Sequence, residues 1–423
     1  MQLWQPSLPE VYRGLGDEHL AAQITDRRHR LGDRLVILGH HYQQDDVIAH
    51  ADITGDSLKL SQLAASVAAE KDVEYVIFCG VHFMAETADM LTPESVKVIL
   101  PDLSAGCSMA DMAAYDDTVS AWNEIHEALN SAHNGDWQGR VVPITYVNSS
   151  AAIKAFVGAH GGACCTSSNA DAVFAWAMNG GTEPAADGDE IKILFLPDQH
   201  LGRNTAHKSG IDVDAHSCVY DPRLAAQGDG IGGSTPEQIA ASEVILWAGH
   251  CSVHKLFRPE HCDSIRAHNA GLAPGERPTQ ILVHPECSKE VVDRADFSGS
   301  TEFIINTLRG AEPGSDWAVG TEFHLVSRMA TEQAERGVRV RTLSDCQCLC
   351  TTMYRIDQPH LLWVLDGLCG LKTTGTESSP AEAKTMVHNV IGVHPDVRGP
   401  ALLAVDRMLC LSQPAARSGV RID

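Results

Sequence analysis

Short apolar runs alternate with longer amphipathic segments along most of this 423-residue chain. The runs are rich in Val, Ile and Leu and are bounded by Gly or Pro, which is typical of parallel strands buried on both faces. We expect strands at Leu35–Leu38, Val73–Phe78, Val96–Leu100, Val141–Val147, Ile191–Leu196, Val244–Trp247, Gln280–Val283 and Val338–Leu343.

Between these runs, apolar residues recur at helical spacing. One stripe consists of Leu60, Leu63, Ala64, Val67 and Ala68, and another of Phe323, Val326, Met329 and Ala330. Repeated strand–helix alternation predicts an α/β fold with parallel sheets.

Polar segments interrupt this alternation. Asp116–Gly139 and Ile211–Glu237 look like insertions, and the second is expected to be loop because it contains GDGIGGSTPEQ. Near the C-terminus, Thr373–Pro380 should break the chain before a helical pattern at Ala381–Val390.

Polar side chains follow several predicted strands directly. The segments are LVILGHHYQ, VIFCGVHF, PITYVNSS, LFLPDQH, ILWAGHCSVH and ILVHPEC. Ligands of open α/β sheets bind outside the carboxyl ends of the strands. The helices that follow present free N–H groups and a positive dipole end, which suits anions. We therefore expect a binding site at these strand ends.

Three cysteines far apart in the chain each follow a strand-like run: Cys107, Cys251 and Cys350. A structural zinc site usually has short paired spacings such as CxxC. Three single thiolates instead suggest three corners of a metal cluster, with the fourth metal open to act as a Lewis acid. The alternative is that all three are structural or redox thiols.

The composition and charge of the chain indicate which partners and cellular locations to expect. The net charge of −23 argues against a nucleic-acid partner, because phosphate contacts need clustered Lys and Arg. No run approaches about 18 apolar residues, so we expect no membrane span. The first residues show no export signal. We expect a cytoplasmic protein whose 13 cysteines are reduced.

Taken together, the strand-end segments resemble the quinolinate synthase family, the A-type proteins of NAD biosynthesis. The resemblance extends from about Leu35 to Leu368. The matching stretches are GHHYQ, ADITGDSLKLSQLA, GVHFMAETADML, LPDLSAGCSMADM, TYVNSSAAIKA, CCTSSNA, FLPDQHLGRN, HCSVHK, VHPEC, GST and VGTEFHL.

The resemblance implies three similar αβα domains around a pseudo-three-fold axis. We expect the first domain at 1–106 with 351–423, the second at 107–250 and the third at 251–350. It also implies condensation of iminoaspartate with dihydroxyacetone phosphate to quinolinate, phosphate and two waters. An aspartate oxidase or dehydrogenase would supply the iminoaspartate, and the enzyme would be a monomer or homodimer.

The same resemblance implies one [4Fe–4S] cluster per chain, held by Cys107, Cys251 and Cys350. The third ligand is chosen from the run Cys346-Gln-Cys348-Leu-Cys350, in which Met353 follows Cys350 as in the family. Three thiols so close together also suggest a strained, regulatory disulfide among them.

Catalytic roles follow from the family positions. Glu286 would be an acid/base group near the open iron, with His284 beside it in HPEC. His40 and Tyr42 alternate by two, so an extended segment would point both the same way, and Tyr42 would take part in proton transfer.

The resemblance assigns substrate binding to His40, Ser57, Tyr146, Asn148, Ser167, His284, Glu286 and Thr301. Hydroxyls and helix N-termini can bind carboxylates and phosphate without many cationic side chains. For Ser57, Ser167 and Thr301 the alternative is a helix N-cap alone.

Two other functions stay open at this point. One is a different hydro-lyase that uses a three-cysteine [4Fe–4S] cluster. The other is a non-catalytic, cluster-based redox sensor, which would have little need for hydroxyls that converge on one cavity.

Overall fold

The computed structural model describes residues 5–70, 72–345, 347–372 and 387–412. These residues form three sheets flanked by helices, so the fold is α/β, as the sequence pattern predicts. They divide into two compact units. The first unit is Met1–Cys107, Glu322–Thr331 and Leu349–His394, and the second is Ser108–Thr321, Glu332–Cys348 and Pro395–Asp423. The three-domain division and its pseudo-three-fold axis stay predictions.

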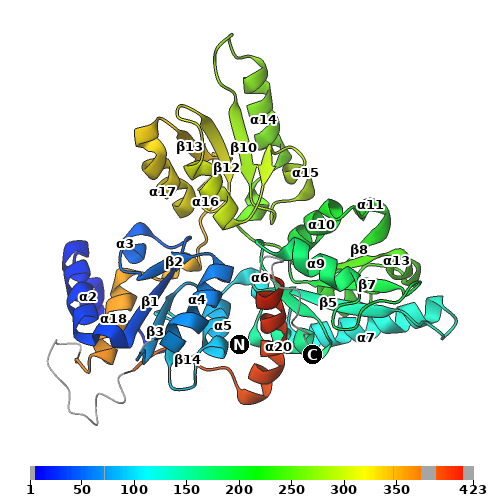
Figure 1. Ribbon diagram of the computed structural model, residues 1–423, viewed down its shortest axis with the longest axis horizontal. Coiled ribbons are helices and arrows are strands. Elements are labelled where there is room, and N and C mark those ends of the chain that lie inside the picture. The colour runs from blue at the N-terminus through cyan, green and yellow to red at the C-terminus, as the bar shows by residue number, and fades with distance from the viewer. Residues whose placement is uncertain (1–4, 71, 346, 373–386, 413–423) are drawn as a thin grey trace. The chain divides into compact units, whose positions relative to one another are not determined.

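The first unit holds one five-stranded sheet between two layers of helices (Figure 1). In spatial order the strands are β14 (Val390–Ile391), β4 (Lys97–Ile99), β3 (Tyr75–Cys79), β1 (Leu35–His40) and β2 (Ile53–Gly55). Only β14 runs antiparallel to its neighbour in this sheet. Its larger helices are α2 (Asp17–Leu31) with α18 (Gln358–Leu368) on one face, and α4 (Ser57–Glu70) with α5 (His82–Leu91) on the other. The shorter helices are α1 (Glu10–Arg13) and α3 (Asp45–Ile48).

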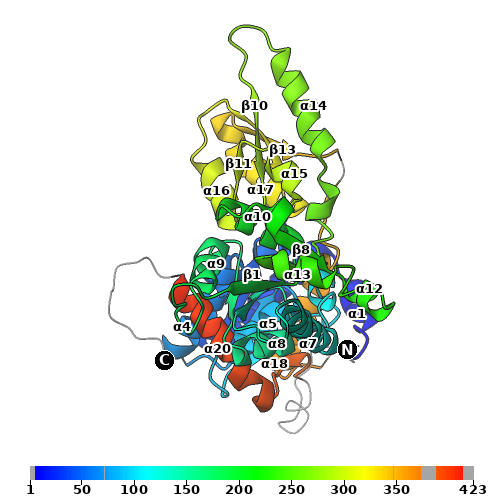
Figure 2. The ribbon, with the colours of Figure 1, turned by 90° about the vertical axis from the view of Figure 1, so that its right-hand side faces the viewer.

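The larger sheet of the second unit is entirely parallel. In spatial order its strands are β6 (Ala163–Cys165), β5 (Arg140–Tyr146), β7 (Ile191–Leu196), β9 (Val244–Trp247) and β8 (Ser217–Tyr220). The associated helices are α6 (Ser108–Asp111), α7 (Tyr115–Ala132), α8 (Ala151–Ala159), α9 (Ala170–Met178), α10 (Gln199–Lys208), α11 (Val213–His216), α12 (Pro222–Ala226), α13 (Pro236–Ala241) and α20 (Pro395–Leu411). Figure 2 shows α20 lying along α8, which it contacts over much of its length.

The smaller sheet of the second unit is also parallel. Its strands are β11 (Phe297–Ser298), β10 (Thr279–Val283), β12 (Asp316–Gly320) and β13 (Arg339–Thr342). Its helices are α14 (Pro259–Ala270), α15 (Lys289–Val292) and α16 (Thr301–Arg309), and α17 (Phe323–Gln333) follows β12. Residues 271–278 join α14 to β10 at the tip of a projection that Figure 2 shows clearly. None of the described helices is both long and apolar enough to cross a membrane.

The predicted strands are confirmed, since each lies within about two residues of an observed one. One expectation about an irregular segment is wrong. Ile211–Glu237 is not simply loop, because Ser217–Tyr220 forms edge strand β8 within it. The helical pattern at Ala381–Val390 lies mostly outside the described residues, and Val390 belongs to strand β14. The polar segment Asp116–Gly139 is largely helix α7, whose apolar stripe faces inward.

A testable consequence concerns the contact between α8 and α20. A Cβ atom at Gly158 would lie 1.9 Å from the carbonyl oxygen of Pro400. Gly158→Ala should force the helices apart and lower the free energy of unfolding by about 1–3 kcal/mol, as overpacking does. Denaturant unfolding measures this change.

Gly399→Ala on the same helix pair is the matched control. A Cβ atom there would have no described atom within 4 Å, and Ala favours helix over Gly. The stability of this variant should be unchanged or higher. If Gly158→Ala were equally stable, the close approach of the two helices would be wrong.

Candidate active site

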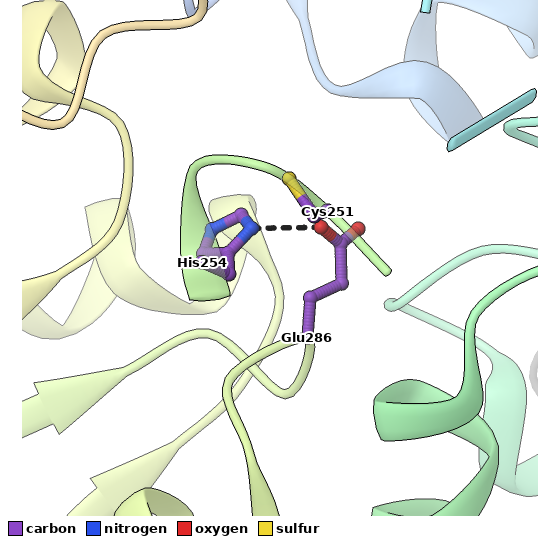
Figure 3. Close-up of side chains that lie close together, drawn as sticks. All are labelled: Cys251, His254 and Glu286. Carbon is purple, nitrogen blue, oxygen red and sulfur yellow. Dashed lines mark hydrogen bonds and ion pairs between the residues drawn. The ribbon is translucent and has the colours of Figure 1, made fainter. Parts of the chain in front are cut away.

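The centre of the site in the second unit is the carboxylate of Glu286, in the loop after β10. Glu286 is 3% exposed, and its Oε2 lies 2.7 Å from Nδ1 of His254. His254 begins the short 3-10 helix that follows Cys251, and its Nε2 is 3.3 Å from Oγ1 of Thr321. One ligand atom each of Cys251, His254 and Glu286 lies within 4.8 Å of the others (Figure 3).

His284 adds a second imidazole to this group. Its ring stacks on that of His254, with centroids 4.5 Å apart. Its Nδ1 accepts the N–H of Glu286 at 3.3 Å, so a neutral ring carries its proton on Nε2, which lies 3.2 Å from Oγ of Ser167. Burial, helped by His254, lowers the pKa of His284 to about 3 although Glu286 opposes the shift. His284 is therefore a neutral donor to Ser167.

Two neighbouring buried carboxyl groups, those of Glu286 and Asp198, have pKa values that are shifted in opposite directions. Burial disfavours the charge of Glu286, but His254 and a hydrogen bond with Tyr146 outweigh it and hold the pKa below its usual range. Burial and the charge of Glu286 raise the pKa of Asp198 well above its usual range. Carboxyls whose environments push their pKa values apart are a common sign of acid–base sites.

The turn that carries Glu286 is held from α10. The side-chain amide of Asn204 donates to the carbonyl oxygens of Pro285 and Cys287, each at 2.8 Å. Cys287 itself is fully buried, its Sγ lies 3.7 Å from the Gly320 carbonyl oxygen, and burial raises the pKa of its thiol well above the usual range. Cys287 is therefore a packed thiol beside the site.

The loops after β5 and β6 bring three of the expected substrate-binding residues to this region. Tyr146 ends β5 and forms a hydrogen bond with Glu286. Ser167 contacts His284. The Oδ1 atom of Asn148 is buried and has no hydrogen-bond partner among the described residues. A buried acceptor atom without a partner can accept a hydrogen bond from an N–H or O–H group of a ligand.

The other two expected hydroxyls begin helices without capping them. Asp56 Oδ1 accepts the N–H of Lys59 at 2.9 Å, so Asp56 caps α4 and Ser57 is its first residue. Ser300 caps α16, and Thr301 is its first residue. For Ser167 as well, the N-cap position of α9 belongs to another residue, Asn169. The capping alternative is therefore wrong for all three.

In the first unit, His40 and Tyr42 lie together after β1. Their rings meet edge to face at 4.8 Å, and Nδ1 of His40 accepts the Tyr42 N–H at 3.2 Å. The expected extended segment is wrong, because the chain turns here and the Gln43 N–H bonds to the His40 carbonyl. Arg328 fixes the turn by donating to the carbonyl oxygens of His41 and Gln43 at 2.9 and 2.7 Å.

The three expected cluster ligands differ from most other cysteines in exposure. Cys107, Cys251 and Cys350 are half-buried. The buried thiols are Cys79, Cys164, Cys165, Cys218, Cys262, Cys287 and Cys348. Burial raises the pKa of Cys79 and Cys164 to about 12, which disfavours the thiolate that binds metals, and it also raises the pKa of Cys350.

Cys107 and Cys350 belong to the first unit and Cys251 to the second. Arg355, just after Cys350, donates to Oγ of Ser104 at 3.1 Å and so ties the two ligand segments of the first unit together. Cys346 lies outside the described residues, so the suggested disulfide stays a prediction.

Three residues of the site were not assigned a role from the sequence. His254 and Thr321 lie in the quoted segments HCSVHK and VGTEFHL, and Asp198 lies in LPDQH. For His254, the signal available in the sequence was its position three residues after the expected ligand Cys251. The partners of all three come from distant segments, which no local pattern reveals.

Comparison with known proteins gives consistent matches. A family model described as "Quinolinate synthetase A protein" matches residues 22–410. The chain is 48% identical over 401 residues to a quinolinate synthase of Herpetosiphon aurantiacus, covering 95% of this chain and 94% of the relative. It is 50% identical over 398 residues to one of Nocardioides, covering 93% and 90%. A Bacillus velezensis quinolinate synthase is 45% identical over 405 residues, with 95% and 96% covered.

The cap assignment can be tested at α4. Asp56→Ala should lower the free energy of unfolding by about 0.5–2 kcal/mol, because it removes the acceptor for an orphan N–H. Ser57→Ala should change stability by less than about 0.5 kcal/mol, as a substitution away from the cap does. Thermal unfolding of both variants measures the difference, and the reverse order of stabilities would show that Ser57 is the cap.

Proposed function

The chain belongs to the quinolinate synthetase A protein family, and on this premise we propose that it condenses iminoaspartate with dihydroxyacetone phosphate to quinolinate, phosphate and two waters. The observation that carries the proposal is the buried Glu286–His254 pair beside Cys251. It joins an ionised carboxylate, an imidazole and a thiol at one point. Acid–base groups within hydrogen-bond reach of one another suit a ring closure that eliminates water.

We propose that Cys107, Cys251 and Cys350 hold one [4Fe–4S] cluster per chain. The donor set fits, because each thiol is half-buried and thiolates are the usual ligands of such clusters. The choice of Cys350 is supported by its neighbour Cys348, which is fully buried with Sγ 3.3 Å from Oγ of Ser344. When bound, the cluster supplies Lewis acidity through an iron that has no protein ligand.

Proton transfer in this proposal begins at Glu286. Since His254 and Tyr146 keep its carboxylate ionised despite burial, Glu286 first acts as a proton acceptor. His254 donates its Nδ1–H to that carboxylate, while Thr321 at Nε2 holds the ring in place. Tyr42, oriented by its contact with His40, is proposed for a second proton transfer.

Substrate carboxylates and phosphate would be bound mainly by neutral donors. We propose Ser57, Ser167 and Thr301 for this role because their hydroxyls are not used as N-caps. Tyr146, Asn148, His40 and His284 complete the proposed set. His284 donates to Ser167, which leaves the hydroxyl proton of Ser167 available for an oxyanion.

The setting of the reaction follows from its chemistry. Iminoaspartate must be made by oxidation of aspartate, so we propose functional coupling to an aspartate oxidase or dehydrogenase. A cluster with an open iron and free thiols fits a reducing cytoplasm. We further propose three αβα domains, at 1–106 with 351–423, at 107–250 and at 251–350, in a monomer or homodimer.

The first test is the reaction itself. Anaerobically purified, iron-reconstituted protein should form quinolinate and one phosphate per turnover from the two substrates. Glu286→Gln should keep its iron but lower turnover by about 10²-fold or more, because it removes a general acid–base group. Glu290→Gln, on exposed α15 near the same turn, is the control and should retain wild-type turnover. A normal rate for Glu286→Gln would assign Glu286 a structural role only.

The second test is the ligand set. Cys107→Ser, Cys251→Ser and Cys350→Ser should each lose iron, because a hydroxyl replaces a soft thiolate poorly. Cys348→Ser is the matched control two residues away and should retain its iron and its absorbance near 400 nm. Iron and sulfide analysis decides the matter. Iron loss in Cys348→Ser with retention in Cys350→Ser would exchange the third ligand.

A further inference from the structure

Lys154 is a fully buried cation behind the loop that carries Asn148. It lies on α8 and is 0% exposed. Its Nζ donates to the carbonyl oxygen of Val147 at 2.8 Å and to that of Ser149. These carbonyls stand on either side of Asn148. Lysine is rarely buried so completely, because removing an ammonium from water is costly.

The loop also has its own hydrogen bonds. Oγ of Ser149 donates to the carbonyl oxygen of Tyr146 at 2.9 Å, and Oγ1 of Thr145 lies 3.0 Å from Oγ of Ser149. These bonds close the turn on the β5 side. Lys154 adds the bridge between the residues before and after Asn148, so it fixes the backbone from which the Asn148 side chain extends.

Asn148 needs such support because its side chain is not held by the protein at Oδ1. That atom is buried and without a hydrogen-bond partner in the described part of the chain. An acceptor kept in place without its own partner binds a ligand without first breaking a protein contact. The backbone must then supply the orientation that a side-chain hydrogen bond otherwise supplies.

We propose that Lys154 is a positioning residue for the substrate site, which acts through Asn148 by holding its Oδ1 acceptor toward a substrate hydroxyl. The inference rests on the proposed function, since it takes that hydroxyl to belong to dihydroxyacetone phosphate.

A second buried lysine provides the matched comparison. Lys192 is 2% exposed, and its Nζ donates to the carbonyl oxygens of Ala240 and Ser242 at 2.6 and 2.7 Å, with Glu190 2.9 Å away. It lies near the start of β7, whereas the site is at the opposite, carboxyl ends of the strands. Lys192 therefore has the same kind of contacts without access to the site.

The experiment compares Lys154→Met with Lys192→Met in the full-length, iron-containing protein. Both should have a lower melting temperature. Only Lys154→Met should bind dihydroxyacetone phosphate more weakly, by about tenfold, the loss expected for one hydrogen bond to a buried acceptor. Titration calorimetry with dihydroxyacetone phosphate is the measurement. Unchanged affinity in Lys154→Met, or equal losses in both variants, would overturn the inference.

A double-variant cycle tests the route through Asn148. If Lys154 acts through it, adding Lys154→Met to Asn148→Ala should cost less than tenfold further, whereas additive losses would contradict this route. If Lys154→Met does not fold, Lys154→Gln, whose side chain is one bond too short to bridge both carbonyl oxygens, should still lose affinity. Wild-type affinity in that variant would overturn the inference. Wild-type protein that neither binds nor forms quinolinate would instead refute the proposed function.

Discussion

The charge of Glu286 is the constraint on which the rest of the site depends. A carboxylate with 3% exposure stays ionised only if protein groups replace the water it has lost. Those groups come from separate segments: His254 after β9 and Tyr146 at the end of β5. The turn must therefore be held accurately, which explains why Asn204 binds the carbonyls on both sides of Glu286.

Parallel strands make this convergence possible. In the second unit, every strand pair of both sheets is parallel, so all the carboxyl ends of a sheet lie at one edge. The loops after β6 and β10 belong to different sheets, yet His284 and Ser167 are within hydrogen-bond distance. The buried strands are mostly apolar, with Lys192 in β7 as an exception, and the chemistry is concentrated in the residues that follow.

The sequence predicted those positions well where a strand had a long apolar run. The ends of β7 and β9 were predicted to the residue, and Cys251 and Glu286 follow strands as expected. Short strands such as β6 and β8 carry too few residues for a period to be recognised. Whether Ser57 or Asp56 caps α4 depends on side-chain geometry, because both are good N-cap residues. The sequence did not identify His254 as the partner of Glu286, because a single histidine has no periodic pattern.

An acidic chain can bind small anions because charge acts locally. The net charge of −23 is a property of the whole sequence, and exposed charges are largely screened beyond about 8–10 Å at physiological salt. A nucleic acid needs cations over an extended surface, and this composition disfavours it. A small dianion needs only a few donors at contact distance. We propose Ser167 and Thr301 as donors of this kind, and Thr301 is buried in the first turn of α16. The same exclusion of water that makes the charge of Glu286 costly therefore makes these few donors effective.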